Sequence, residues 1–446
     1  MPADAEDALR GEVARLLGVP VRARVDGVAG LPSPLPVGAL VTAAVAGFAD
    51  AVADLVGDPG AVVHRDRSAQ WFRSALRPDG WAPPPPWDPV AGDYPGADGW
   101  IRLHTNAPHH RAAALRVLGV PAERDAVAAA VRARPVAELE ADVVAAGGCA
   151  ARMRTTADWT GSVEGRAVAA EPLIDVRPGD EGPMRREPPD PSRPLAGVRV
   201  LDLTRVLAGP VATRALAGVG ATVLRIDPPD WDEPGVVPDV TLGKRVARLG
   251  GRTPAGRARL HALLAGADVL VHGYRQGALD HLGLGEDERR RIRPGLVDVA
   301  LDAYGWTGPW SHRRGFDSLV QMSTGIAEAG MREAGAAKPV PLPVQALDHA
   351  TGWLMAAAAV ALLREAGRTG RGGSARLSLA RTAAALLGVP GPDVGSAPPA
   401  PEGHGTPIAT PWGPATVAPP PFEVDGVGFR FDAGPAPLGS DEPAWP

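Results

Sequence analysis

The alternation of short apolar runs with helical segments after residue 195 constrains the fold of this chain most. Four apolar runs have the length and composition of buried strands: Val198–Leu203, Thr222–Ile226, Ala267–Val271 and Leu296–Leu301. Segments of helical pattern lie between them, namely Val211–Gly218, Thr253–Leu264 and Glu286–Ile292. Strands that alternate with helices predict a parallel sheet covered by helices, so we expect an α/β fold with a Rossmann-like large domain.

Proline-rich stretches divide the rest of the chain. The sequence contains 55 glycines and 49 prolines in 446 residues, and prolines gather at Pro83–Pro86, Arg177–Pro194 and Pro390–Pro419. An alternating strand pattern at Trp100–His104, followed by Ala-rich helical segments, indicates a second and smaller α/β domain. We therefore expect five parts: a mainly helical N-terminal part (1–97), a small α/β domain (98–176), a linker (177–194), a large domain (195–390) and a Pro-rich connection with a returning C-terminal segment (391–446).

Composition excludes several classes of protein. The net charge is −5 and no basic cluster is interleaved with aromatic residues, which argues against a nucleic-acid binder. The longest apolar run, Trp353–Leu363, is about half of the ~20 residues that a membrane span needs. The acidic N-terminus has no signal-peptide core, Cys149 is the single cysteine, and no histidines have metal-ligand spacing. We expect a cytoplasmic enzyme with neither a metal site nor a nucleic-acid or membrane partner.

The first strand–helix turn does not favour a nicotinamide cofactor. The turn contains Gly209-Pro210 in place of the G-x-G-x-x-G loop that cradles a pyrophosphate. Asp227 follows the second strand, as a ribose-binding acid would, but this match is weak without the glycines.

Asp348 stands directly before a strongly helical segment and has two interpretations. Its carboxylate could cap the helix N-terminus, the usual role of aspartate there. Alternatively, the helix dipole would stabilise its anion, as a carboxylate nucleophile requires. The local pattern permits both roles.

Motifs across residues 194–390 resemble those of a known family, and this resemblance favours one of the two interpretations of Asp348. The segment 194–227 (PLAGVRVLDLTRVLAGP…GATVLRID) resembles the N-terminal motif of the family III CoA-transferases, which include formyl-CoA transferase, carnitine CoA-transferase and α-methylacyl-CoA racemase. The similarity continues in the family's order through these segments: 243–245 (GKR), 253–257 (TPAGR), 267–271 (ADVLV), 274–279 (YRQGAL), 305–309 (GWTGP), 315–317 (GFD), 348–352 (DHATG) and 369–372 (TGRG).

The resemblance implies a reaction and a set of site residues. Asp348 matches the aspartate that attacks an acyl-CoA thioester and passes CoA to a carboxylic acid through covalent aspartyl intermediates. CoA would be a substrate, and no permanently bound cofactor is expected. The positions that match the family's CoA contacts are Leu207, Ala208, Lys244, Gly273, Tyr274, Arg275 and Arg314.

Two alternatives remain beside transfer. An α-methylacyl-CoA racemase needs a histidine in its Gly-His-Asp triplet, and here the triplet is Gly315-Phe316-Asp317. Phenylalanine neither accepts nor donates a proton, so the sequence favours transfer over racemisation. The other alternative is a protein that binds acyl-CoA without catalysis.

The order of the parts departs from that of the family. Segments 98–106 and 145–174 resemble the family's small domain, which normally follows the catalytic aspartate and here precedes it. The tail after Thr410 resembles the family's closing segment. This order indicates a permuted chain or the remnant of a fusion, with residues 1–97 as the rest of a large domain. The resemblance further implies a homodimer.

Overall fold

A mostly parallel sheet of seven strands forms the centre of the molecule. The computed structural model describes residues 2–28, 30–57, 60–182, 190, 192–391 and 405–446. The strand order is β10-β9-β8-β11-β12-β13-β7, and only β7 runs antiparallel to its neighbour. The bounds are β7 Asp175–Glu181, β8 Arg199–Leu203, β9 Thr222–Asp227, β10 Lys244–Arg248, β11 Val269–His272, β12 Val297–Asp302 and β13 Arg371–Ser378. The predicted α/β class and Rossmann-like sheet are confirmed.

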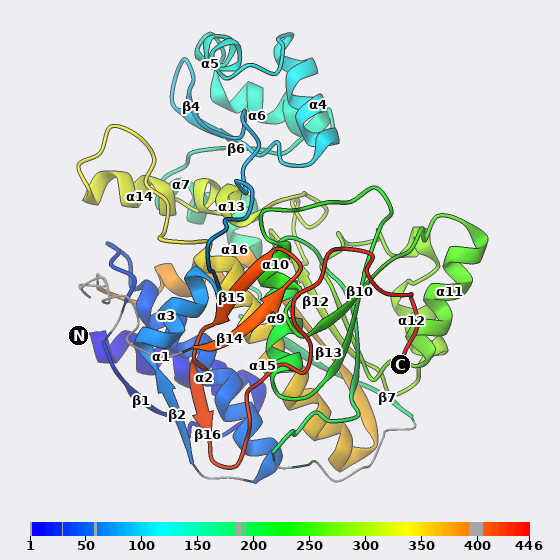
Figure 1. The fold of residues 1–446 in the computed structure, drawn as a ribbon. Coiled ribbons are helices and arrows are strands. Elements are labelled where there is room, and N and C mark those ends of the chain that lie inside the picture. Colours follow the sequence, from blue (N-terminus) through cyan, green and yellow to red (C-terminus); the bar gives the residue numbers. More distant parts are fainter. Residues whose placement is uncertain (1, 29, 58–59, 183–189, 191, 392–404) are drawn as a thin grey trace.

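Helices connect and cover these strands (Figure 1). They are α9 Ala208–Gly218, α10 Val237–Val240, α11 Pro254–Ala265, the 3₁₀ turn Asp280–Leu282, α12 Glu286–Ile292, α13 Asp317–Ser323, α14 Ile326–Glu333, α15 Ala346–Thr369 and α16 Leu379–Leu387. The start of α11 follows the sequence signal. Thr253 Oγ1 accepts a hydrogen bond from the Gly256 amide at 3.0 Å, and Pro254 is the first helical residue.

The predicted linker 177–194 is partly wrong. Its first residues belong to β7, which pairs along β13 at the edge of the main sheet. An ion pair between Arg371 and Glu181, 3.1 Å apart, links the two strands. Proline and charged residues led to the linker prediction, but an edge strand tolerates both because one of its sides faces solvent. Residues 183–189 and 191 lie outside the described residues.

The small domain has its own core and stands at one end of the molecule (Figure 1). Its antiparallel sheet consists of β4 Gly92–Pro95, β5 Trp100–Leu103 and β6 Ala150–Arg152. Its helices are α4 Pro108–Leu118, α5 Arg124–Arg132 and α6 Val136–Ala145, and α7 Thr156–Gly161 and α8 Val163–Ala169 lead back to the main sheet. The domain therefore begins before the predicted boundary at residue 98, because β4 pairs with β5.

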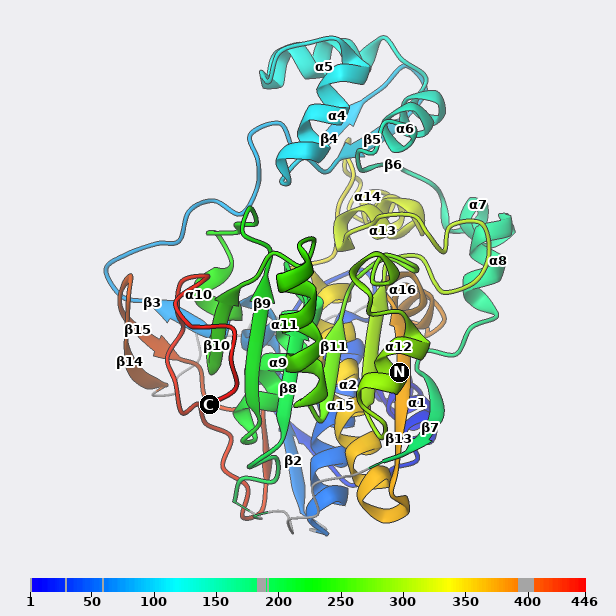
Figure 2. The ribbon, with the colours of Figure 1, turned by 90° about the vertical axis from the view of Figure 1, so that its right-hand side faces the viewer.

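The N-terminal and C-terminal segments form two further sheets together (Figure 2). The N-terminal elements are α1 Pro2–Leu17, β1 Arg24–Asp26, α2 Val37–Val56, β2 Ala61–His64, α3 Arg65–Arg73 and β3 Leu76–Pro78. The C-terminal strands are β14 Thr406–Thr410, β15 Gly413–Val417 and β16 Phe422–Val424. The sheets have the orders β1-β2-β16 and β14-β15-β3, so residues 1–97 contribute strands as well as the predicted helices.

Two long apolar helices, α2 and α15, occupy the interior. Both are long and apolar enough to cross a membrane by length and composition, but 78% and 94% of their most apolar windows are buried inside the protein. They share one hydrophobic core, in which the rings of Phe48 on α2 and Trp353 on α15 lie 5.4 Å apart. This packing joins the N-terminal part to the large domain.

Candidate active site

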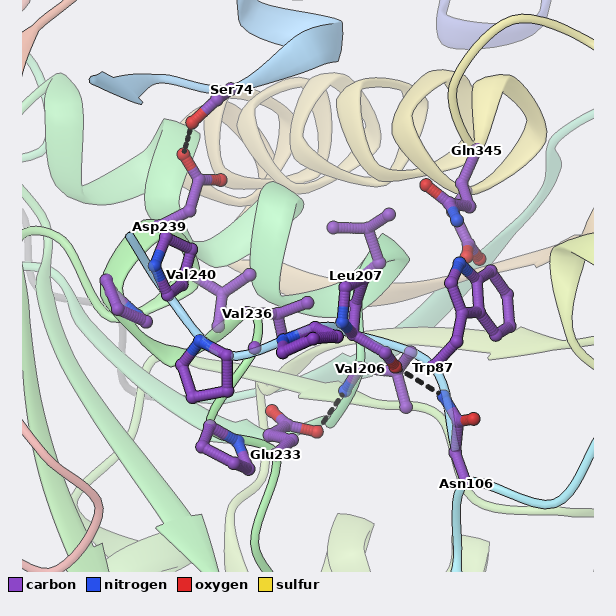
Figure 3. Close-up of a pocket in the computed structure, with 18 of the residues that line it drawn as sticks. Ser74, Trp87, Asn106, Val206, Leu207, Glu233, Val236, Asp239, Val240 and Gln345 are labelled. Atoms are coloured by element: carbon purple, nitrogen blue, oxygen red, sulfur yellow. Dashed lines mark hydrogen bonds between the residues drawn. The ribbon is translucent and has the colours of Figure 1, made fainter. Parts of the chain in front are cut away.

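A cavity of about 780 Å³ lies where the N-terminal part, the small domain and the large domain meet. One wall comes from the segment between α3 and the small domain, with Ser74, Trp81 and Pro83–Pro86 among its residues. Val206, Leu207 and Glu233 line the cavity from the large domain, and Gln345 and Asp348 do so from the start of α15. Figure 3 shows side chains from these separate segments around a common space.

Asp348 lies in the first turn of α15 rather than at its N-cap. The cap position is Gln345, which makes no capping hydrogen bond through its side chain, and the helix begins at Ala346. The first of the two sequence interpretations, Asp348 as the cap, is therefore wrong. The Asp348 side chain reaches the cavity wall while the residue is only 8% exposed.

Asp317, the first residue of α13, caps α15 in place of Asp348. Its Oδ2 accepts hydrogen bonds from the backbone amides of Leu347 at 2.9 Å and Asp348 at 3.0 Å. Its Oδ1 accepts from the Gln321 side chain, whose Oε1 in turn accepts from the Leu342 amide at 2.8 Å. This network fixes the backbone of Asp348 through a carboxylate from a different helix.

Both carboxyl groups of this pair are buried, and burial raises the pKa of each. The pKa of Asp348 lies well above its usual value because of burial and, secondarily, the nearby charge of Asp317. Burial raises the pKa of Asp317 to about 6, although its hydrogen bonds oppose the shift. The helix dipole favours the anion of Asp348, whereas desolvation by burial opposes it and raises the pKa.

Two residues at or next to the cavity lining have a strained backbone conformation. Among the described residues, the only non-glycine residues with positive φ are Val206, at +69°, and Val344, at +57°. Val206 precedes α9 and its amide donates to Glu233 Oε2 at 2.9 Å, whereas Val344 precedes the start of α15. β-Branched residues rarely adopt this conformation, and such strain gathers at functional sites.

Asp239 of the large domain binds the cavity wall that the N-terminal part provides. Its Oδ1 accepts from the amides of Ala75 at 2.7 Å and Leu76 at 3.1 Å, and from Ser74 Oγ at 3.0 Å (Figure 3). Its other oxygen pairs with Arg214. Although burial raises the pKa of Asp239, the Arg214 charge and these hydrogen bonds outweigh it and hold that pKa below its usual value. An ionised carboxylate therefore positions this wall.

The four consecutive prolines form part of the same wall. A side chain at Gly235 would meet Pro86 Cα at 2.8 Å, so the proline segment contacts the loop before α10 closely. The Asn106 side chain donates to the Pro86 carbonyl at 2.8 Å and its Oδ1 accepts from the Asp88 amide at 3.0 Å. The proline run, interpreted from sequence as a joint between domains, is therefore also a wall of the cavity.

The Gly315-Phe316-Asp317 triplet lies at the cavity, with a histidine from the small domain against it. The ring of His104 stacks on Phe316 with centroids 3.7 Å apart and planes 6° from parallel. Both residues line the cavity that Asp348 lines. The triplet predicts only a missing histidine from its sequence; neither the capping role of Asp317 nor the position of His104 has a local sequence signal, because both depend on distant segments that meet in the fold.

The predicted CoA-contacting residues divide into three groups. Leu207, the N-cap of α9, lines the cavity, and Ala208 begins that helix but is not among the lining residues. Lys244 departs from the prediction: its side chain is fully buried and its Nζ donates to Asp202 Oδ2 at 3.1 Å and to the Pro210 carbonyl at 2.9 Å. An ammonium group enclosed in this way supports the first strand–helix turn from inside and does not reach a nucleotide.

The third group lies beside the cavity. Gly273 and Arg275 are exposed in the loop after β11, and Tyr274 is half-buried. The Arg205 guanidinium lies 4.9 Å from the ring centre of Tyr274 and 5.1 Å from that of Trp231, which lines the cavity. Burial and the nearby charge of Arg314 both lower the pKa of Arg275. The structure therefore brings Tyr274, Arg275 and Arg314 into one basic surface beside the cavity.

Comparison with known proteins identifies the domain that carries Asp348. The model of "CoA-transferase family III" matches residues 195–413. This segment, just under half of the chain, is similar to CoA-transferase family III. This match covers every strand of the main sheet except β7, together with the helix that carries Asp348.

Individual relatives match the same family III domain. The acetyl-coenzyme A transferase nodX of Hypoxylon pulicicidum is 37% identical over 198 residues, which are 43% of this chain and 33% of that protein. The succinyl-CoA:glutarate CoA-transferase of Mus musculus is 36% identical over 196 residues, 41% of this chain and 44% of that protein. The chain thus spans less than half the length of either curated relative.

Solved structures match a similar share of this chain. A crystal structure of Rv3272 from M. tuberculosis is 31% identical with a TM-score of 0.41, and the match covers 44% of this chain and 56% of that one. A CAIB/BAIF family protein from Brucella suis is 29% identical with a TM-score of 0.39, over 44% of this chain and 55% of that one.

Proposed function

We propose that this chain is a CoA-transferase that moves CoA between an acyl-CoA and a carboxylic acid, with Asp348 as covalent nucleophile. The observation that carries the proposal is the buried carboxyl group of Asp348, which faces a large cavity from a helix start held by a second carboxylate. The names of the family III relatives, which act on acyl-CoA thioesters and acids, support the same reaction.

The reaction consists of four acyl transfers. A carboxylate oxygen of Asp348 attacks the thioester carbonyl, the C–S bond breaks, and CoA leaves as a thiolate, so that a mixed anhydride of Asp348 and the acyl group remains. The thiolate attacks the aspartyl carbonyl and expels the first acid, which leaves an aspartyl-CoA thioester. The acceptor carboxylate attacks that thioester and expels CoA thiolate again, which then attacks the acceptor carbonyl and restores the Asp348 carboxylate.

The raised pKa of Asp348 suits this chemistry because a desolvated carboxylate is a stronger nucleophile than a hydrated one. The ionised form of Asp348 is the nucleophile in the first step. In our proposal the surface of Tyr274, Arg275 and Arg314 binds the phosphates of CoA, since guanidinium groups match phosphate geometry. Leu207, Ala208 and Gly273 would then contribute backbone contacts to CoA.

Trapping the covalent intermediate tests the function. Wild-type protein and Asp348→Asn are incubated with a panel of acyl-CoA thioesters, treated with hydroxylamine or borohydride, and digested for mass spectrometry. We expect a hydroxamate or a reduced side chain at Asp348 in the wild type and none in the variant. An unmodified Asp348 with every thioester in the panel contradicts the proposal.

The two alternatives from the sequence have distinct signatures. An α-methylacyl-CoA epimerase would incorporate deuterium from the solvent at the α-carbon without acyl transfer. A non-catalytic acyl-CoA binder would bind CoA thioesters equally well with and without Asp348→Asn and would turn none over. Cytoplasmic location, the homodimer and the lack of nucleic-acid and membrane partners remain predictions.

A further inference from the structure

A seven-residue pattern occurs twice in the chain. Residues 34–40 read PLPVGAL and residues 341–347 read PLPVQAL, identical at six of the seven positions. The first pattern leads into α2 and the second into α15, the two long apolar helices of the core. Each helix is followed in the chain by a strand and another helix, β2 and α3 in the first case and β13 and α16 in the second.

The strand pairings repeat as well. β2 lies between β1, which is parallel to it, and β16, which is antiparallel. β13 likewise lies between the parallel β12 and the antiparallel β7. The antiparallel edge strand comes from the opposite half of the chain in both cases: β16 is in the C-terminal tail and pairs with the N-terminal sheet, while β7 follows the small domain and pairs with the main sheet.

We propose that this chain contains two copies of one folding unit, which exchange their edge strands, and that only the second copy has kept a nucleophile. The position of Asp348 in the second pattern corresponds to Val41 in the first, an apolar core residue that is 1% exposed. The first copy instead supplies the wall opposite Asp348, through Ser74, Trp81 and Pro83–Pro86. The two copies within one chain therefore build one site together.

Cross-linking of the exchanged strands tests this arrangement without any use of the proposed activity. Val62 faces Glu423 across β2 and β16, and Glu181 faces Arg371 across β7 and β13. The double variants V62C/E423C and E181C/R371C are treated with a short bis-maleimide, and the four single variants are the controls. The natural Cys149 is buried, and burial raises its pKa to about 12, so it is a poor target.

We expect each double variant to give a product of single-chain mass that contains the linked peptide pair. Covalent dimers in place of that product, or no linked pair, would overturn the proposal. The number of sites gives a second test that rests on the proposed function: trapping should label one aspartate per chain and none in Asp348→Asn. Two labelled positions in one chain would overturn the single-site inference while the transferase function stands.

A different observation concerns His104. The His104 side chain lines the cavity, and the residue is 5% exposed. Its Nδ1 has no hydrogen-bond partner among the residues that the structure describes. A buried polar atom without a partner is costly, and active sites accept this cost when a ligand provides the partner. Burial lowers the pKa of His104 to about 3, so the ring is neutral and can donate one hydrogen bond without adding a charge.

From this we infer that His104 hydrogen-bonds the acyl carbonyl oxygen of the substrate, an inference that rests on the proposed function. The stack on Phe316 holds the imidazole plane, and Phe316 directly precedes Asp317, whose carboxylate fixes the backbone of Asp348. Two adjacent residues, Phe316 and Asp317, thus position the two groups: Phe316 holds the imidazole that would bind the substrate, and Asp317 holds the backbone of Asp348, which would attack it. A neutral donor at this place would also stabilise the oxyanion that forms during each attack.

The variant His104→Phe keeps a flat ring against Phe316 but removes both nitrogens. We expect it to lower kcat/KM about 10- to 100-fold, mainly through kcat, while the melting temperature stays within a few degrees. The matched control is His110→Phe. His110 is similarly buried, at 4% exposed, and its ring centroid lies 5.9 Å from that of Phe316, but His110 does not line the cavity. We expect near wild-type turnover for the control.

Imidazole provides a readout that a purely structural role would not move. In His104→Ala, added imidazole should occupy the vacated space and restore part of the activity, while it should not help His110→Ala. Wild-type kcat/KM in His104→Phe, or equal losses in both phenylalanine variants, would overturn the assignment. Lack of turnover in the wild type itself would instead contradict the proposed function, and calorimetric binding of acetyl-CoA to both proteins would then decide whether His104 contacts the ligand.

Discussion

The helices α2 and α15 start from almost the same seven residues, yet only one start faces the cavity with a reactive group. Val37 is the first residue of α2, whereas Val344, at the same place in the second pattern, has φ +57° and lies before α15 begins. The start of α15 is capped by Asp317 through two backbone hydrogen bonds, while α2 has no side-chain cap at Pro36. Similar local sequences thus give a plain core helix in one place and a strained, externally capped site in the other.

This difference shows that the site depends on what is packed against the helix start. Val41 is surrounded by apolar core, and Asp348 adjoins a cavity and a second carboxylate. Substitutions at matched positions in the two patterns test this difference.

The largest difference in activity is expected between variants at two matched positions, Asp348 in the second pattern and Val41 in the first. Asp348→Ala should lower kcat by at least about 10³-fold because it removes the attacking oxygen. Val41→Ala should leave kcat within a few-fold and lower the free energy of unfolding by about 1–2 kcal/mol, since it removes buried methyl groups. Steady-state transferase assays and urea unfolding measure both, and equal losses of activity would remove the distinction between the two copies.

Removal of the external cap should have the next largest effect. Asp317→Ala leaves the amides of Leu347 and Asp348 without their acceptor, so we expect kcat to fall about 10- to 100-fold through misplacement of Asp348. The free energy of unfolding should fall by about 1–2 kcal/mol. Asp317→Asn, which keeps an acceptor oxygen, should recover most of the stability, and failure to recover it would show that the charge rather than the hydrogen bonds holds the helix.

The pH dependence of activity should identify the charge coupling in this pair. Because the pKa of Asp348 is raised, kcat/KM should rise with pH as the nucleophile ionises. Asp317→Asn removes the neighbouring negative charge and should shift the rising limb of the profile to lower pH. A profile that keeps its midpoint in this variant would contradict coupling between the two carboxyl groups.

The contribution of Asp348 to the free energy of unfolding should fall as pH rises, whereas kcat/KM should increase. A carboxyl group whose folded-state pKa is raised binds more protons in the folded than in the unfolded protein, so its contribution to stability is present at low pH and is lost as pH rises through the folded pKa. Asp348→Asn should therefore gain stability relative to the wild type at pH 8 and show no such gain near pH 4. Thermal melts at the two pH values measure this difference, and Val41→Asn should not reproduce the pH dependence.

The smallest effect is expected at the two valines of the repeated pattern. Val344→Gly relieves a positive φ and should change the free energy of unfolding by between zero and about +1 kcal/mol. Val37→Gly removes a fully buried side chain from a helix and should lower it by about 2 kcal/mol or more. Equal destabilisation by both changes would show that the conformation of Val344 carries no strain.

Much of the fold could be predicted from local sequence. The four apolar runs predicted β8, β9, β11 and β12 but not β10 or β13, and Thr253-Pro254 predicted the start of α11 correctly. The repeated PLPV pattern is short and its copies are far apart in the chain, so by itself it predicts no repeat of the fold; the matching pairings of β2 and β13 give it that meaning. The edge strand β7 was missed because prolines and charges are typical of linkers as well as of sheet edges.

An α/β domain with an aspartate at a helix start could be predicted from the amino-acid sequence alone, because hydrophobic period, capping residues and family motifs are local properties. The burial and raised pKa of Asp348, the capping of its helix by Asp317 and the enclosure of Lys244 against Asp202 follow from the packing of distant segments. Desolvation and charge coupling depend on which groups meet in space. Here the groups that meet come from segments as distant as Ser74, His104 and Asp348.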